Sequence, residues 1–179
     1  KDLGYDFYDP KSFEKEFDLQ DPIVFGIPRG GVVPAVVLAN QLSADLDVVI
    51  CRKIRCPDQP ELALGAVSED GEVFLYHTAR DSYVTGEEIE QECERQKQEI
   101  ARRRRIIRKI LPPVEVKGRS VIVADDGIAT GSTMIAALHI FRQKSVHEVI
   151  AAVPVAPPDS LKNLESYCDR VVCLFTPES

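Results

Sequence analysis

Short apolar runs and helical patterns alternate along most of the chain. Continuous apolar runs predict buried strands, at residues 23–27, 47–51, 116–124, 149–155 and 171–175. The stretches between them have the apolar spacing of helices, at residues 32–42, 132–143 and 158–167. Strands that alternate with helices need crossover connections. The pattern therefore predicts an α/β fold with a mostly parallel, twisted sheet and helices on both of its faces.

The middle of the chain has a different pattern. Residues 63–76 predict a β-hairpin, because Asp70 and Gly71 form a turn signal between two strand-like runs. Thr85 opens a capping-box sequence at the start of a long helix, and the proline pair at residues 112–113 ends that helix. This antiparallel and helical stretch interrupts the alternation and predicts an insertion into the parallel sheet.

Length and composition limit the classes of protein. The 179 residues, 44% hydrophobic and 28% charged, predict one globular domain over residues 1–179, with residues 77–112 as a helical insertion. The net charge of -7 argues against general binding to nucleic acid or anionic membranes. No apolar run approaches the roughly 18 residues of a membrane span, and no secretory signal is recognisable. The five cysteines include no CxxC pair; Cys51 and Cys173 fit buried free thiols, which favours a cytoplasmic protein.

The loops at the carboxyl ends of the predicted strands carry the unusual chemistry. In open parallel sheets, ligands bind beyond those ends. We therefore expect the loops after Ile27, Cys51 and Ala124 to converge on one site.

The stretch VIVADDGIATGSTM, residues 121–134, joins a predicted strand to a predicted helix. The first N–H groups of a helix have no partners within the helix, and the helix dipole favours an anion there. A glycine and three hydroxyl side chains surround this helix start and favour a phosphate monoester, at Thr130, Gly131, Ser132 and Thr133.

Two adjacent carboxylates, Asp125 and Asp126, precede this helix start. Carboxylates suit the hydroxyls of a sugar attached to the phosphate, or a divalent cation. The combination predicts a site for ribose 5-phosphate. The alternative is a plain turn followed by a helix capped by Ser or Thr, with no ligand.

This stretch closely resembles the phosphoribosyl-pyrophosphate motif of type I phosphoribosyltransferases. The resemblance extends over roughly residues 21–177, and the sequences IPRGG, RK, PELALGAV and VPVAPP are similar to a little-characterised bacterial and archaeal group of the family. It implies that Asp125 and Asp126 hold the ribose hydroxyls. It also implies that the loop binds the 5-phosphate, with substrate-binding positions at Gly127, Ala129, Thr130, Gly131, Ser132 and Thr133.

The sequence GIPRGG, residues 26–31, follows the first predicted strand. Arg29 can bind phosphate oxygens in a bidentate manner, and Gly30 and Gly31 permit backbone geometries that other residues avoid. A tight turn with an exposed arginine is the alternative. The resemblance implies that this loop binds pyrophosphate and contains a cis peptide, which we expect between Arg29 and Gly30.

Further basic residues, Arg52 and Lys53, end the second predicted strand, and residues 53–62 predict a polar loop. With Arg29, these side chains and Arg55 would offset the charge of a pyrophosphate. The resemblance assigns Lys53 to pyrophosphate. It also implies that residues 55–62 form a loop that closes over the reacting centre and excludes water.

The resemblance implies a phosphoribosyltransferase of nucleotide metabolism that uses phosphoribosyl pyrophosphate and Mg²⁺. Catalytic roles fall to Arg29, Lys53, Asp125 and Asp126, with the two aspartates binding Mg²⁺ indirectly through ribose or water. Relatives that act on 6-oxopurines carry an aspartate where this chain has Ala129. We therefore expect a different nitrogenous acceptor.

Residues 1–20 or 77–112 would supply the hood that selects the acceptor in this family, or the insertion would form a dimer element. We expect a homodimer. Other activities stay open: a non-catalytic regulator that senses phosphoribosyl pyrophosphate or a nucleotide and binds RNA, or hydrolysis with water as the acceptor.

The basic sequence ARRRRIIRK, residues 101–109, ends the long helix. Cations suit a helix C-terminus, and Glu99 can pair with Arg103 at a spacing of four residues. The alternative is binding of RNA or capture of an anionic substrate. Given the acidic net charge, we expect the structural role and no nucleic-acid partner.

Overall fold

The structure is a computed structural model that describes residues 18–59, 62–80, 82–128 and 131–177. The chain forms two compact units. The first unit comprises Lys1–Val49 and Val114–Ser179, and the second comprises Ile50–Pro113. The predicted cap or hood at residues 1–20 falls almost wholly outside the described residues. Among the described residues, no helix is both long enough and apolar enough to cross a membrane.

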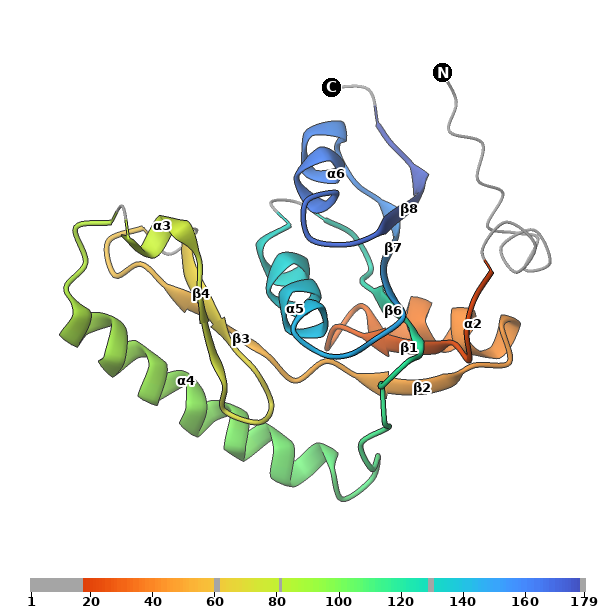
Figure 1. Cartoon of the computed structure of the whole chain (residues 1–179), viewed down its shortest axis with the longest axis horizontal. Coiled ribbons are helices and arrows are strands. Elements are labelled where there is room, and N and C mark those ends of the chain that lie inside the picture. Colours follow the sequence, from red (N-terminus) through yellow and green to blue (C-terminus); the bar gives the residue numbers. More distant parts are fainter. Residues whose placement is uncertain (1–17, 60–61, 81, 129–130, 178–179) are drawn as a thin grey trace. The chain divides into compact units, whose positions relative to one another are not determined.

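The first unit is built on a five-stranded sheet in the order β2-β1-β6-β7-β8, with every neighbouring pair parallel (Figure 1). Its strands are β1 (Ile23–Gly26), β2 (Asp45–Val48), β6 (Ser120–Ala124), β7 (Glu148–Val155) and β8 (Arg170–Phe175). Its helices are α2 (Val32–Gln41), α5 (Ser132–Arg142) and α6 (Pro158–Leu164). The predicted α/β fold with a parallel sheet is confirmed.

The two faces of this sheet bury different sets of side chains. On one face, Val24 and Ile122 pack in a buried cluster with residues of α2, including Leu38. On the other face, the ring of Phe25 lies 4.5 Å from that of Phe141 on α5. Since successive side chains of a strand point to opposite faces, α2 and α5 cover opposite sides of the sheet.

The strand order places a topological switch point between β1 and β6. From β1 the chain crosses through α2 to β2 on one side, and from β6 it crosses through α5 to β7 on the other. Right-handed crossovers in opposite directions explain why the two helices lie on opposite faces. In parallel sheets, ligands bind beyond the carboxyl ends of the strands at such a point, which here is formed by β1 and β6.

The second unit contains a three-stranded antiparallel sheet and a long helix. Its elements are β3 (Arg52–Arg55), β4 (Ala63–Val67), β5 (Val73–Leu75), α3 (His77–Arg80) and α4 (Gly86–Ile107). The hairpin is confirmed, with Gly71 in the left-handed region at φ 82° and its N–H bonded to the carbonyl of Ser68 at 3.0 Å. The capping box is confirmed as well, because Thr85 and Glu88 exchange both hydrogen bonds.

Several boundaries differ from the sequence predictions; β6 begins at Ser120 rather than residue 116, and α6 ends at Leu164 rather than residue 167. The second strand ends at Val48 rather than residue 51, because the following residues leave for the second unit. Residues 52–55 form β3 rather than a polar loop, since they pair with the hairpin strand β4. Helix α4 ends at Ile107, several residues before the prolines, in hydrogen-bonded turns at Ile110 and Leu111. All five cysteines are free, and Cys51 and Cys173 are half-buried.

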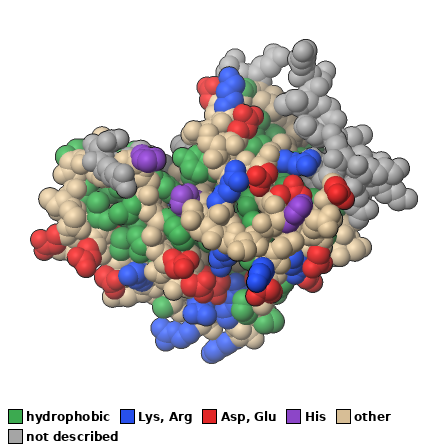
Figure 2. Space-filling model, in the orientation of Figure 1, with side chains coloured by type: hydrophobic (Ala, Val, Ile, Leu, Met, Phe, Trp, Pro, Cys, Tyr) green, Lys and Arg blue, Asp and Glu red, His purple; other side chains and the backbone are tan. Residues whose placement is uncertain are grey.

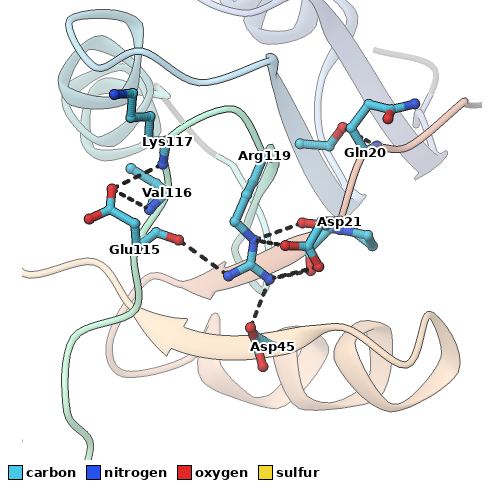
Figure 3. A network of polar contacts seen from close by, with 9 residues as sticks. Gln20, Asp21, Asp45, Glu115, Val116, Lys117 and Arg119 are labelled. Atoms are coloured by element: carbon cyan, nitrogen blue, oxygen red, sulfur yellow. Dashed lines mark hydrogen bonds and ion pairs between the residues drawn. The ribbon is translucent and has the colours of Figure 1, made fainter.

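Arg119 ties together the amino ends of three neighbouring strands (Figure 3). Its guanidinium donates to the carbonyl of Asp21 at 2.8 Å before β1, and to that of Glu115 at 3.2 Å before β6. It also lies 2.7 Å from a carboxylate oxygen of Asp45, the first residue of β2. The side chain is only 12% exposed, so these bonds are largely protected from water.

We expect Arg119→Ala to lower the free energy of unfolding by about 2 kcal/mol, because carbonyl groups at two strand starts lose a charged donor. Urea denaturation measures the change. Arg142→Ala is the control, since Arg142 makes one ion pair with Asp169 at 3.1 Å and is 42% exposed. Its loss should stay within about 1 kcal/mol. Equal losses in the two variants would contradict a structural role for the Arg119 network.

Candidate functional site

The loops after β1 and β6 lie side by side at the switch point. Gly26 pairs with Ala124 in the sheet, and the N–H of Ile27 donates to the carbonyl of Ala124 at 2.9 Å. The first loop then closes through a bond of 3.0 Å from the N–H of Gly31 to the carbonyl of Ile27. The predicted convergence of these two loops is therefore observed within the first unit.

Gly30 and Gly31 permit this approach because they lack side chains. A Cβ on Gly31 would lie 2.5 Å from the carbonyl oxygen of Ala124 and 2.8 Å from the Cα of Asp125. A Cβ on Gly30 would overlap the carboxylate of Asp126. The loop that contains Gly30 and Gly31 (the glycine loop) thus packs against Asp125 and Asp126, and we call this contact the junction.

The two carboxylates of the junction differ in environment. Asp126 is exposed, whereas Asp125 is half-buried and accepts a hydrogen bond of 2.9 Å from the N–H of Asp126. Burial raises the pKa of Asp125 to about 6; the N–H of Asp126 opposes this rise, and the charge of Asp126 adds to it. Asp125 is still largely ionised at neutral pH and can accept hydrogen bonds from hydroxyl groups.

The loop that follows the acidic pair ends at the start of α5. Gly131 is the N-cap residue and has φ 75°, a left-handed conformation that favours glycine. It has no side chain to cap the first turn, whereas Ser132 is half-buried and Thr133 is exposed. Of the predicted phosphate-binding positions, Ala129 and Thr130 lie outside the described residues.

Gly127 and Ile128 hold this loop against the neighbouring strand. The N–H of Ile128 donates to the carbonyl of Val155 at 3.1 Å, at the end of β7. A Cβ on Gly127 would make ordinary contact with Val155 at 3.4 Å. The loop therefore does not need a glycine at residue 127 for packing, in contrast to the loop after β1.

Arg29 is exposed at the tip of the glycine loop. The predicted cis peptide between Arg29 and Gly30 is wrong by one residue, because the cis bond joins Pro28 to Arg29. The residue types do not separate the two positions, since sequence favours a cis bond only immediately before a proline.

Arg52, Lys53 and Arg55 belong to β3 of the second unit, not to the end of the second strand or the loop that follows it. Their convergence with the junction stays a prediction. The same holds for closure of residues 55–62, of which Pro60 and Glu61 lie outside the described residues.

Helix α4 holds the side chain of Arg52. The Nε of Arg52 donates to Oε1 of Gln96 at 2.9 Å, and Nε2 of Gln96 donates to Oε1 of Glu92 at 2.7 Å. Burial lowers the pKa of Arg52, and the charges of Arg103 and Arg55 lower it further. Sequence reasoning missed Glu92 and Gln96. Their spacing around the apolar position Cys93 placed them on the buried face of α4 and could have indicated them.

The acidic pair could take part in binding a magnesium ion only with help from other ligands. Among the described residues, no group of three His, Cys, Asp or Glu side chains is placed to hold a metal ion. Mg²⁺ prefers oxygen ligands and keeps several waters. Asp125 and Asp126 therefore fit a magnesium ion that they reach through water or through a bound substrate.

The geometry defines an α/β protein with a candidate ligand site at a topological switch point. Residues 11–176 match the sequence profile of the phosphoribosyl transferase domain. The chain belongs to this family.

Relatives of known name share this domain. A Mycobacterium tuberculosis protein named "Putative phosphoribosyl transferase MT0597" is 39% identical over 156 residues, which cover 87% of this chain and 35% of that protein. The chain thus spans about a third of the curated relative's length. Among solved structures, TT1426 from Thermus thermophilus has a TM-score of 0.87 at 39% identity, covering 95% of this chain and 81% of that one.

An adenine phosphoribosyltransferase from Giardia lamblia, solved with 9-deazaadenine, shares the fold with a TM-score of 0.53. Its identity is 14%, and the match covers 95% of this chain and 78% of that one. At this identity the likeness shows the fold alone.

We expect an added methyl group to have different effects at the two glycines of the junction. In Gly31→Ala the methyl group meets backbone atoms of β6, so we expect the free energy of unfolding to fall by about 3 kcal/mol. In Gly30→Ala it meets only the end of the Asp126 side chain, which can rotate away, so the loss should stay below about 1 kcal/mol. Urea denaturation of both variants measures the difference, and equal losses would contradict the packed junction.

Because the pKa of Asp125 is raised, we expect replacement of this residue to stabilise the protein by an amount that depends on pH. Between its ordinary value of 3.8 and about 6, the folded protein keeps a proton that the unfolded chain releases. The stability that this proton confers is complete below the unfolded pKa of 3.8. It is lost as the pH rises through the folded pKa of about 6. At neutral pH, Asp125→Asn should therefore raise the free energy of unfolding by on the order of 1 kcal/mol after solvent screening.

This gain should disappear below about pH 4, where the aspartate is protonated in both states. Denaturation of the two proteins across this pH range measures it. Asp18→Asn is the control, because Asp18 is an exposed carboxylate in a loop. A gain that does not depend on pH would rule out the buried charge as its cause.

Proposed function

We propose that the chain binds phosphoribosyl pyrophosphate and transfers its phosphoribosyl group to a nitrogenous acceptor other than a 6-oxopurine, with release of pyrophosphate. Family membership supports the class of transferase. The observation that carries the finer proposal is the junction of Gly30 and Gly31 with Asp125 and Asp126, beside the start of α5.

In this proposal the sugar phosphate spans the loop after β6. The start of α5 after Gly131, where Ser132 is half-buried and Thr133 is exposed, donates N–H and hydroxyl groups to the 5-phosphate. Asp125 and Asp126 accept hydrogen bonds from the ribose hydroxyls. Because the Asp126 carboxylate also lies beside Gly30, the ribose would bind next to the pyrophosphate loop.

The chemical step breaks the bond between C1 of ribose and a pyrophosphate oxygen. Pyrophosphate leaves with the electron pair, and the lone pair of an acceptor nitrogen forms the new bond to C1. Arg29 at the loop tip, with Arg52 and Lys53 of β3, would stabilise the negative charge that develops on the leaving group. The contacts of Arg52 with Gln96 orient its guanidinium before any ligand binds.

Magnesium suits this proposal because the acidic pair offers only oxygen ligands. When bound, Mg²⁺ would neutralise charge on the pyrophosphate. Asp125 and Asp126 would orient it through ribose hydroxyls or water. The exclusion of a 6-oxopurine as the acceptor rests on Ala129, because alanine supplies no carboxylate to bind the ring of that base.

We expect Asp125→Asn combined with Asp126→Asn to weaken phosphoribosyl pyrophosphate binding at least about 100-fold, because both acceptors for the ribose hydroxyls lose their charge. Isothermal titration calorimetry in the presence of Mg²⁺ measures the affinity. Since Asp125→Asn should stabilise the fold at neutral pH, unfolding would not explain the loss. Unchanged affinity in the double variant would refute the role of the acidic pair.

A panel of bases and nucleosides with labelled phosphoribosyl pyrophosphate tests the transfer itself. Pyrophosphate release that depends on one acceptor supports the proposal. If phosphoribosyl pyrophosphate binds but no acceptor causes release of pyrophosphate, the chain is a non-catalytic sensor and not a transferase. Release that needs no acceptor would replace it with hydrolysis.

A further inference from the structure

A cleft of about 700 Å³ lies within the second unit, between the last turns of α4 and the β4–β5 turn. None of its residues belongs to the proposed phosphoribosyl site. Five basic side chains line it from α4 and its end, and two acidic ones line it from the turn. The basic residues are Lys97, Arg104, Arg105, Arg108 and Lys109. Figure 2 shows Lys and Arg side chains gathered at this end of α4, at the bottom of the view.

One wall of the cleft is a fixed ion pair. Both carboxylate oxygens of Glu69 lie 2.6 Å from guanidinium nitrogens of Arg108, whose side chain is 12% exposed. Arg104 approaches the same carboxylate at 3.4 Å. This bidentate pair anchors the turn to the end of the helix.

Of the remaining cations, Lys97 pairs with Glu94 at 2.8 Å, and two others are not paired in this way. Arg105 and Lys109 are exposed, and no carboxylate within the described residues pairs with either. They are one helical turn apart and face the same cleft. By contrast, Arg102 and Arg103, on the same helix, both bind the carboxylate of Glu99 at 2.9 Å.

The size and surroundings of the cleft favour a compact anion. Its volume falls within the range of small-molecule sites, about 300–1,000 Å³. The first half of α4 is acidic, and the whole chain carries a net charge of -7, so an extended polyanion would meet repulsion beyond the cleft. Gly71 forms the opposite rim, and nothing lies within 4 Å of where its Cβ would be.

We propose that this cleft is a second anion site, which binds a small molecule with two or more adjacent phosphates through Arg105 and Lys109. Arg105 contacts phosphate oxygens with its guanidinium fork, and Lys109 adds a point charge one turn further on. Arg104, which shares Glu69 with Arg108, lines the cleft beside them.

Inorganic tripolyphosphate is the probe, and isothermal titration calorimetry of the full chain measures its affinity. Arg105→Ala with Lys109→Ala should weaken binding at least tenfold. The matched control, Arg102→Ala with Arg103→Ala, removes the same number of positive charges and should change the affinity less than about twofold, because these residues share the carboxylate of Glu99 and do not line the cleft. Thermal denaturation checks that both variants are folded.

Arg29→Ala separates this site from the proposed pyrophosphate loop. In the Arg29→Ala background the cleft should still bind tripolyphosphate, and adding Arg105→Ala with Lys109→Ala should weaken that binding at least tenfold; loss of all binding in Arg29→Ala alone, with retention in the cleft variant, would overturn the proposal. Equal losses in the two helix variants, or no saturable binding to the parent chain, would also overturn it. Tighter binding of a single-stranded oligonucleotide, weakened equally by both helix variants, would identify a nucleic-acid surface instead.

Discussion

The absence of side chains at Gly30 and Gly31 is the constraint on which the candidate site depends. It allows the loop after β1 to touch the end of β6, so that the carboxylate of Asp126 rests against the glycine backbone. A methyl group at residue 31 would separate the two strand ends, since it would meet backbone atoms that the sheet register fixes. The loop after β1 and the acidic pair are therefore held next to each other by the register of β1 and β6.

The half-buried position of Asp125 at this site lowers the stability of the folded protein. Half-burial raises the pKa of Asp125, so an ionised carboxylate at neutral pH costs the folded state free energy. Contacts at the amino ends of the strands offset that cost. There, Arg119 supplies charged donors to the starts of β1, β2 and β6. One end of the sheet is thus fixed by paired charge, while the other carries the charge of the candidate site. Such a division is expected where strain and desolvation are concentrated at a functional site.

The sequence was sufficient for the parallel sheet, because strands buried on both faces produce continuous apolar runs such as Val121–Ala124. It also located the glycine loop and the acidic pair, since their residue types have few structural uses. It failed at residues 52–55, where polar side chains concealed a strand whose pairing comes from a distant hairpin. It could not place the cis peptide, and it missed Gln96, whose position on the buried face of α4 near Cys93 was the only local signal of its contact with Arg52.

Helix α4 shows how a single element can carry opposite charge for different reasons. Its acidic first turns suit the helix dipole and the capping box at Thr85, and its basic last turns suit the opposite pole. Dipole and pairing account for Arg102 and Arg103, which share the carboxylate of Glu99, and for Arg108, which holds the hairpin turn. They do not require Arg105 and Lys109 to stay uncompensated on the cleft face. Exposed cations that no neighbour neutralises keep their capacity to bind an anion, and here a cleft limits how large that anion can be.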